Sequence, residues 1–288
     1  VKAVGNSANA AVSATRLGLR TALISNIGDD QNGRDCLETL KKQKVDTRYI
    51  ARESNKTTNF HYVLWYDVDR TILVHHEDFH HKLPESFKRG PAPRWLYLTS
   101  VGSGSYPYHQ EIYEYLKAHP DVKLAFQPGT FQMKLGTEEL KDIYERTEVF
   151  IVNVEESQRI LKREEKGFAG NADIKDLLAS IHALGPKIVL ITDGSKGAYM
   201  YDGDRYYFMP IYPDPKPPYE RTGCGDAFAS TYVSSLILGH TPIEAFTWAP
   251  INPMSVAQYI GAQEGLLTRA QIEDFLKKAP ASYRPAEI

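Results

Sequence analysis

Short apolar runs alternate with helical patterns along most of the chain. Runs that predict buried strands occupy residues 20–28, 45–51, 94–101, 122–129, 148–154 and 187–194. Helical spacing of apolar residues occupies residues 10–17, 33–44, 108–119, 137–147 and 173–184. Strands that alternate with helices are typical of a mostly parallel sheet covered on both faces. The pattern therefore predicts a doubly wound α/β fold.

One segment departs from this alternation. Residues 57–77, TTNFHYVLWYDVDRTILVHHE, contain two β-rich runs joined by turn residues at 67–69, which predicts a β-hairpin. Aromatic and β-branched residues occur on both faces of the first run, so neither face is expected to be wholly solvated. We therefore expect a lid at residues 56–78 and an α/β core made of residues 1–55 and 79–288.

Composition and charge narrow the possible partners. The 288 residues can bury a substantial core, and the formal net charge of −2 gives no footprint for nucleic acid or an anionic membrane. No apolar run approaches the roughly 18–20 residues of a membrane span. Cys36 and Cys224 form neither a metal-type spacing nor a disulfide framework, which suits a reducing compartment. We expect a cytoplasmic protein without nucleic-acid or membrane partners.

The start of the chain carries a further expectation. It enters directly at VKAVGNSANAAVSATRLG, a glycine turn that runs into a helical pattern, with no initiating Met and no preceding strand. We therefore expect that the natural N-terminus, with a first strand, is absent from this sequence.

The stretch YERTGCGDAFAS, residues 219–230, brings two glycines and an aspartate to a predicted helix start. Helical apolar spacing begins near Gly225 or Asp226. The first amides, from Gly223, Cys224 and Gly225, lack intrahelical acceptors and are suited to bind an anion. Asp226 either caps this helix or accepts a proton from a hydroxyl that attacks a bound phosphoryl group.

A family resemblance bears on that choice. ERTGCGDAF resembles the C-terminal signature, D-T-x-G-A-G-D, of the ribokinase-like (PfkB) family of carbohydrate and nucleoside kinases. VGNSANAAVSATRLG is similar to the family's G-G-x-x-x-N signature, LISNIGDDQNG to its following strand and turn, and NVEE to its N-x-x-E motif. ITDGSKGAYMY and APINPMSVAQYIGAQEG resemble its nucleotide-side strand and its closing helix. These landmarks fall in the family's order and imply the ribokinase-like fold with a β-hairpin lid.

The resemblance implies an ATP-dependent kinase that transfers the γ-phosphoryl group to a hydroxyl, primary by preference, of a sugar. Asp226 then corresponds to the family's general base, and the amides of residues 223–225 to its anion hole. Arg221 and Glu220 depart from the signature. Arg221 either reaches a phosphate of the nucleotide or pairs with Glu220.

Asn153 and Glu156 match the N-x-x-E motif, which in the family organises Mg²⁺ and its waters near the ATP phosphates. The resemblance thus implies Mg²⁺ as cofactor and ATP as co-substrate, and it leaves a monovalent cation such as K⁺ open. The same residues also fit a helix cap with a capping-box glutamate. Further nucleotide-binding residues implied by the resemblance are Thr192, Gly194, Gly197, Asn252 and Ser255.

On the acceptor side, Asn9 matches the asparagine of G-G-x-x-x-N and is expected at sugar hydroxyls. Gly5 gives close backbone approach, and Asn6 either adds a polar contact or caps the helix. Phe60 and Tyr62 of the hairpin are placed to cover the acceptor.

The acceptor itself stays open between several interpretations. The aromatic hairpin fits a nucleoside kinase of the same family as well as a sugar kinase, because an aromatic ring stacks on a base. The stretch FQPGT stands where many sugar kinases resemble D-x-N-R, and the loss of the acid and the arginine favours an acceptor without a phosphate. Val4 and Arg221 keep open a catalytically silent sugar-binding regulator. The resemblance also implies a homodimer formed through the lid.

Overall fold

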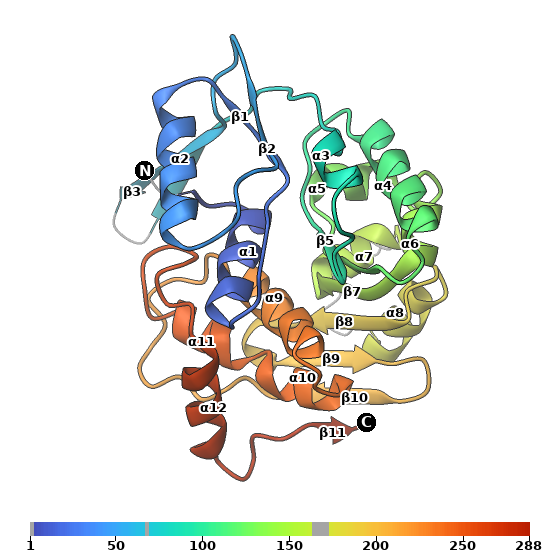
Figure 1. Ribbon diagram of the computed structural model, residues 1–288. Helices are drawn as coiled ribbons and strands as arrows, with labels where there is room; N and C mark the ends of the chain where they lie inside the picture. Colours follow the sequence, from blue (N-terminus) through green and yellow to red (C-terminus); the bar gives the residue numbers. More distant parts are fainter. Residues whose placement is uncertain (1–2, 67–68, 163–172) are drawn as a thin grey trace.

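The computed structural model describes residues 3–66, 69–162 and 173–288. Its largest sheet has seven strands in the order β11-β10-β9-β8-β7-β6-β5 (Figure 1). The parallel half contains β5 (Trp95–Leu98), β6 (Lys123–Phe126), β7 (Thr147–Asn153) and β8 (Ile188–Thr192). The antiparallel extension contains β9 (Ala198–Tyr201), β10 (Tyr206–Met209) and β11 (Ala286–Glu287). The mostly parallel α/β sheet predicted from the sequence is therefore confirmed.

Both faces of this sheet are buried, because successive side chains of a strand point to opposite faces. In β7, Val149 and Ile151 belong to one hydrophobic cluster, whereas Phe150 and Val152 belong to another. The first cluster is covered by α9 (Cys224–Ile237), α10 (Pro242–Trp248), α11 (Ile251–Val256) and α12 (Arg269–Lys277). The second is covered by α3 (Glu85–Lys88), α4 (Tyr106–Ala118), α5 (Thr130–Leu135), α6 (Lys141–Arg146), α7 (Val154–Ile160) and α8 (Ile174–His182). Helices thus lie on both faces, as the doubly wound pattern predicts.

Two small sheets complete the strands. β1 (Ser25–Gly28) and β2 (Ile50–Glu53) are parallel to each other and separate from the large sheet. β3 (Phe60–Tyr66) and β4 (Asp69–His75) form the predicted antiparallel hairpin, with Phe60 opposite His75. Two of the expected turn residues, Asp67 and Val68, lie outside the described residues.

The N-terminal elements differ in extent from the prediction. α1 (Asn6–Arg16) begins at Asn6 rather than Ala10, because Gly5 serves as its N-cap and accepts the first helical hydrogen bond from the Asn9 amide at 2.8 Å. The strand expected at residues 20–28 is limited to β1, and Ala22 makes only an isolated bridge to Asp46. α2 (Gln31–Lys42) follows, capped by Asp30.

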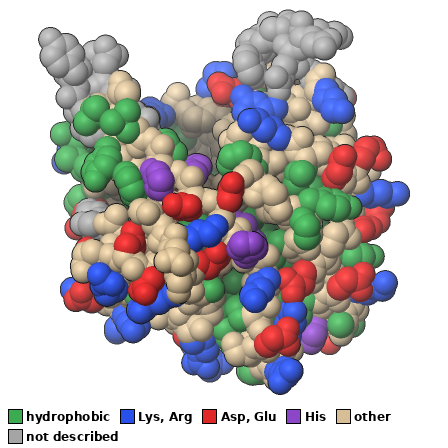
Figure 2. Space-filling model, turned by 90° about the horizontal axis from the view of Figure 1, so that it is seen from above, with side chains coloured by type: hydrophobic (Ala, Val, Ile, Leu, Met, Phe, Trp, Pro, Cys, Tyr) green, Lys and Arg blue, Asp and Glu red, His purple; other side chains and the backbone are tan. Residues whose placement is uncertain are grey.

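A cavity of about 1880 Å³ separates β1 from β5. Residues 24–26 line one side of it and residues 95–98 the other, while Ala10 and Ala14 of α1 and Val233 of α9 contribute small side chains. Seen from above, the molecule is hollowed beside the part that carries the hairpin (Figure 2). The cavity continues to Gly5 and Asn6, and so reaches the start of α1.

Candidate active site

Asp226 lies buried at the start of α9, with only 7% of its surface exposed. The helix has Gly223 as its N-cap, in the left-handed region at φ 81°, so it begins at Cys224, slightly earlier than predicted. Asp226 is consequently the third residue of a 14-residue helix, where the helix dipole favours a negative charge.

Three side-chain amides surround the Asp226 carboxylate. Asn6 Nδ2 donates to Oδ1 at 2.9 Å, Asn9 Nδ2 donates to Oδ2 at 2.8 Å, and Gln127 Nε2 donates to Oδ1 at 3.4 Å. Burial raises the pKa of Asp226 above its usual range, while these three hydrogen bonds act in the opposite direction. The N-cap of α9 has no side-chain cap, so Asp226 is held by residues far away in sequence rather than used to cap its own helix.

Two of these three side-chain amides are oriented by further hydrogen bonds. Gln263 Nε2 donates to Asn9 Oδ1 at 2.9 Å, and Tyr97 Oη donates to Gln127 Oε1 at 2.6 Å. Each contact leaves an amide NH₂ facing the carboxylate. Site roles for Gln263, Gln127 and Tyr97 are not evident from the sequence, since nothing local in it links them to Asp226.

The two glycines of the turn before Asp226 differ in the space around them. A Cβ on Gly223 would lie 2.3 Å from the Cβ of Ala262, whereas a Cβ on Gly225 would meet nothing within 4 Å. The Cys224 amide donates to Arg221 O at 3.2 Å, so one of the three amides expected to bind an anion already takes part in a turn. Burial raises the pKa of the Cys224 thiol to about 11, which keeps it protonated near neutral pH.

Arg221 is exposed beside this turn. The Glu220 carboxylate, its alternative partner, instead accepts a hydrogen bond from the Gly261 amide. Within the described part of the chain Arg221 makes no ion pair, so its guanidinium is accessible next to the glycine turn.

Asn153 and Glu156 form the capping box that their spacing allows. Asn153 Oδ1 accepts from the Glu156 amide at 2.8 Å, and Glu156 Oε2 accepts from the Asn153 amide at 2.9 Å. Burial raises the pKa of Glu156, and the negative charge of Asp226 raises it further. A divalent cation would relieve that repulsion, and this donor set fits Mg²⁺. The described residues contain no group of three metal-ligating side chains.

The residues expected at the nucleotide fall into two groups. Thr192 ends β8 directly beside Asn153, which ends β7, so both lie at the carboxyl edge of the sheet. Gly194 and Gly197 have positive φ angles of 54° and 111° in the turn that follows. Asn252 is different, because it is fully buried and its side chain bonds Thr231 Oγ1 and the Leu267 amide, both at 2.9 Å. The structure thus places Asn252 in the core rather than at the cleft.

Ser255, the other residue expected near the base, is 8% exposed. On the acceptor side, Phe60 stacks on His75 with ring centroids 4.9 Å apart and also contacts Tyr62. Tyr62 is 61% exposed, and both aromatic residues line the large cavity together with Gly5 and Asn6.

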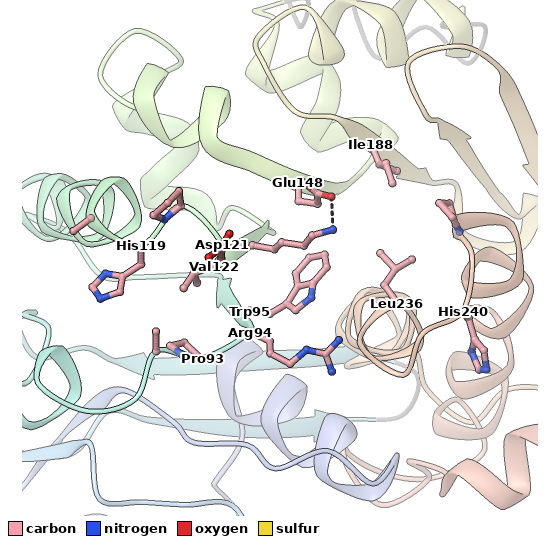
Figure 3. Close-up of a pocket in the computed structure, with 15 residues that line it drawn as sticks. Pro93, Arg94, Trp95, His119, Asp121, Val122, Glu148, Ile188, Leu236 and His240 are labelled. Carbon is pink, nitrogen blue, oxygen red and sulfur yellow. Dashed lines mark hydrogen bonds and ion pairs between the residues drawn. The ribbon is translucent and has the colours of Figure 1, made fainter.

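A second cavity, of about 670 Å³, lies at the opposite edge of the sheet (Figure 3). Its lining includes Trp95, Lys123 and Ile188, the first residues of β5, β6 and β8. Lys123 Nζ is paired with Glu148 at 2.8 Å and lies over the Trp95 ring. Ligands of open α/β sheets bind beyond the carboxyl ends of the strands, where Gln127, Asp226 and Glu156 lie, so the Asp226 cleft is the candidate site.

Comparisons with known proteins identify the family of the chain. The family model described as "pfkB family carbohydrate kinase" matches residues 1–269. A fructokinase from Klebsiella pneumoniae is 25% identical over 290 residues, which cover 96% of this chain and 91% of that protein. Among the described residues, every helix is too short or too polar to traverse a lipid bilayer.

Two solved structures share the fold. The ribokinase of Arabidopsis thaliana, complexed with ribose and ATP, has a TM-score of 0.80 and 20% identity, covering 95% of this chain and 87% of that one. A protein from E. coli described as ribokinase II, in complex with ATP and Mg²⁺, has a TM-score of 0.75 and 19% identity, covering 95% and 88%. The chain therefore belongs to the pfkB family of carbohydrate kinases, which transfer a phosphoryl group to an alcohol acceptor.

Proposed function

We propose that this protein is an ATP-dependent kinase that transfers the γ-phosphoryl group to a hydroxyl, primary by preference, of a sugar, with Asp226 as the general base. The observation that carries the proposal is a buried carboxylate at a helix start, ringed by Asn6, Asn9 and Gln127. The three amides donate to the carboxylate and so favour its ionised form, which is the form that accepts a proton, whereas burial raises the pKa of Asp226.

The remaining residues would act on the transferred group. The amides of residues 223–225 lie at the N-terminus of α9, where an anionic oxygen would be stabilised, and the Cys224 amide would have to leave Arg221 O to take part. Exposed Arg221 is close enough in sequence to add a cation at the same place. When bound, Mg²⁺ supplies charge neutralisation on the phosphates, and Glu156, with Asn153, is the residue that would hold it through water.

The test of the base is Asp226→Asn. Turnover should fall roughly 10²- to 10⁴-fold, the usual effect of losing a positioned base, while ATP affinity changes little. ADP release measured with a coupled assay, and nucleotide binding measured by calorimetry, give the two readouts. Near-normal turnover in Asp226→Asn would overturn the assignment.

The acceptor requires its own experiment. Phe60 and Tyr62 line the cavity and offer aromatic faces, which supports a nucleoside acceptor as the second candidate. ADP release should be measured over pentoses, hexoses, nucleosides and their phosphates, with K⁺ and Na⁺ compared. Release with sugars alone supports the sugar kinase, and release with nucleosides the alternative. Sugar binding without any release would instead favour the silent regulator.

The hairpin fits two roles in this proposal. It exposes Tyr62, Leu64, Leu73 and Val74, so apolar surface is available to cover the acceptor or to pair with a second copy. We extend the proposal to a homodimer formed through the hairpin, tested by light scattering. Leu73→Asp should yield a monomer if this surface joins two copies, and a dimer that persists would place the interface elsewhere.

A further inference from the structure

Gln127 lies where the chain departs from the D-x-N-R pattern that its family resemblance predicts. It directly follows β6, and its backbone amide donates to Leu98 O at 2.9 Å, which ties it to the neighbouring strand β5. Its half-buried side chain reaches Asp226 Oδ1 at 3.4 Å. An uncharged amide therefore lies beside Asp226, in a stretch where the D-x-N-R pattern would have an acid and an arginine.

Tyr97 decides which way the Gln127 amide faces. Its hydroxyl donates to Gln127 Oε1 at 2.6 Å. Burial raises the pKa of Tyr97 well above its ordinary value, and the charge of Asp226 adds to the effect, so the phenol stays protonated and remains a donor. With Oε1 engaged by Tyr97, the NH₂ group of Gln127 can only face the carboxylate.

The amides do not divide evenly between the two carboxylate oxygens. A carboxylate offers roughly four acceptor positions, two on each oxygen. Asn6 and Gln127 both donate to Oδ1, whereas among the described residues Asn9 alone donates to Oδ2. The position that stays open is on Oδ2.

We propose that Tyr97 and Gln127 form a positioning pair that saturates Oδ1 of Asp226 and leaves Oδ2 as the atom that receives the acceptor proton. This inference rests on the proposed role of Asp226. In the step it describes, the acceptor O–H bond breaks and its proton passes to Oδ2. The freed oxygen bonds to the γ-phosphorus of the nucleoside triphosphate, and the bond from that phosphorus to the bridging oxygen breaks, releasing the diphosphate.

The first test is Gln127→Met, which keeps the length of the side chain and removes its donor. We expect kcat to fall roughly 10- to 100-fold, the scale of a misplaced catalytic group, with the acceptor KM within about twofold. The pKa of Asp226 should rise because a hydrogen bond to the carboxylate is lost, so the acid limb of the kcat profile moves to higher pH. An unmoved acid limb, or a tenfold higher acceptor KM with kcat kept, would overturn the proposal.

The second test is Tyr97→Phe, alone and combined with Gln127→Met. Because the two side chains act as one pair, the double variant should lose about as much kcat as Gln127→Met alone. Additive losses would show that the residues act separately and would contradict the pair.

Tyr283→Phe is the matched control, since Tyr283 Oη also donates a partly buried 2.6 Å hydrogen bond, to Thr247 O in α10. It should lower the unfolding temperature about as much as Tyr97→Phe and leave the pH profile unchanged. An equal change of the profile in both variants would reduce Tyr97 to a packing role. Near-normal turnover of Asp226→Asn would refute the proposed base and with it the proton transfer to Oδ2, whereas normal pH profiles in the Gln127 and Tyr97 variants, with Asp226→Asn inactive, would refute the pair alone.

Discussion

Two helices of the core begin with a carboxylate at the same place, three residues after the N-cap. In α7 the N-cap is Asn153 and the carboxylate is Glu156, and in α9 they are Gly223 and Asp226. Glu156 folds back onto the amide of its own N-cap, whereas Asp226 is held by side chains of α1 and of the residue after β6. The same helix position thus holds a local cap in α7 and, in α9, a carboxylate bound by residues distant in sequence.

The N-cap residue accounts for the difference. Asn153 has extended backbone angles and a side chain that accepts from the Glu156 amide, so both halves of a capping box can form. Gly223 has no side chain and lies in the left-handed region, so no reciprocal cap forms and the Asp226 carboxylate turns to other partners. The left-handed backbone of Gly223 is the decisive part, because the extended glycine N-cap of α5, Gly129, still donates its amide to Gln132 Oε1 at 2.7 Å.

The strongest test of this difference between α7 and α9 is to give Gly223 a side chain. Gly223→Ala puts a Cβ 2.3 Å from Ala262 Cβ at a positive φ, so we expect about 3 kcal/mol of destabilisation. Gly225→Ala is the control, because its Cβ meets open space and alanine favours the helix by about 0.5–1 kcal/mol. Chemical denaturation measures both.

Turnover should separate the same two variants in another way. Gly225→Ala keeps the fold, but its Cβ would enter open space beside the glycine turn proposed to bind the phosphoryl group, so ADP release should fall well below that of the unmodified protein. Full activity in Gly225→Ala would remove Gly225 from the proposed anion hole.

A second test removes one hydrogen-bonding partner from each of the two carboxylates, Glu156 and Asp226. Asn153→Ala removes the N-cap of α7 and should cost about 1 kcal/mol of stability, measured by denaturant unfolding. Asn6→Ala removes an exposed partner of Asp226 and should cost less stability, while the acid limb of the activity profile moves to higher pH. Equal stability losses with unchanged pH profiles would show that the two helix starts do not differ in role.

Much of this fold follows from local sequence. The alternation of apolar runs gives the strands of the parallel sheet, and the hairpin follows from β-rich residues around a turn. The start of α1 was missed because Asn6, Ser7 and Asn9 lack apolar spacing, yet Asn6 and Asn9 donate hydrogen bonds to Asp226. The burial of Asn252 could not be predicted, because a polar residue in a closing helix gives no sign that it bonds Thr231 and Leu267 inside the core.

The candidate site was predictable only in part. Asp226 and its glycines follow from one short stretch, but their partners are 217 and 220 residues away in α1 and 99 residues away after β6. No periodicity links such positions. The hydrogen bonds from Gln263 to Asn9 and from Tyr97 to Gln127 are harder still to predict, since they orient the partners of Asp226 and do not contact Asp226 itself.

The smallest expected effect concerns Glu156 and pH. Its folded-state pKa is raised above the ordinary 4.5, so its contribution to stability is greatest below that value and is lost as pH rises through the folded pKa. Glu156→Gln keeps an acceptor for the Asn153 amide and removes the buried charge, so at pH 7 it should raise the unfolding temperature by roughly 2 °C. The gain should vanish below pH 4.5, whereas turnover should require more Mg²⁺ at every pH. If Glu156→Gln is less stable than the unmodified protein at pH 7, the charge contributes to the cap, and the contrast with Asp226 is weaker than the geometry indicates.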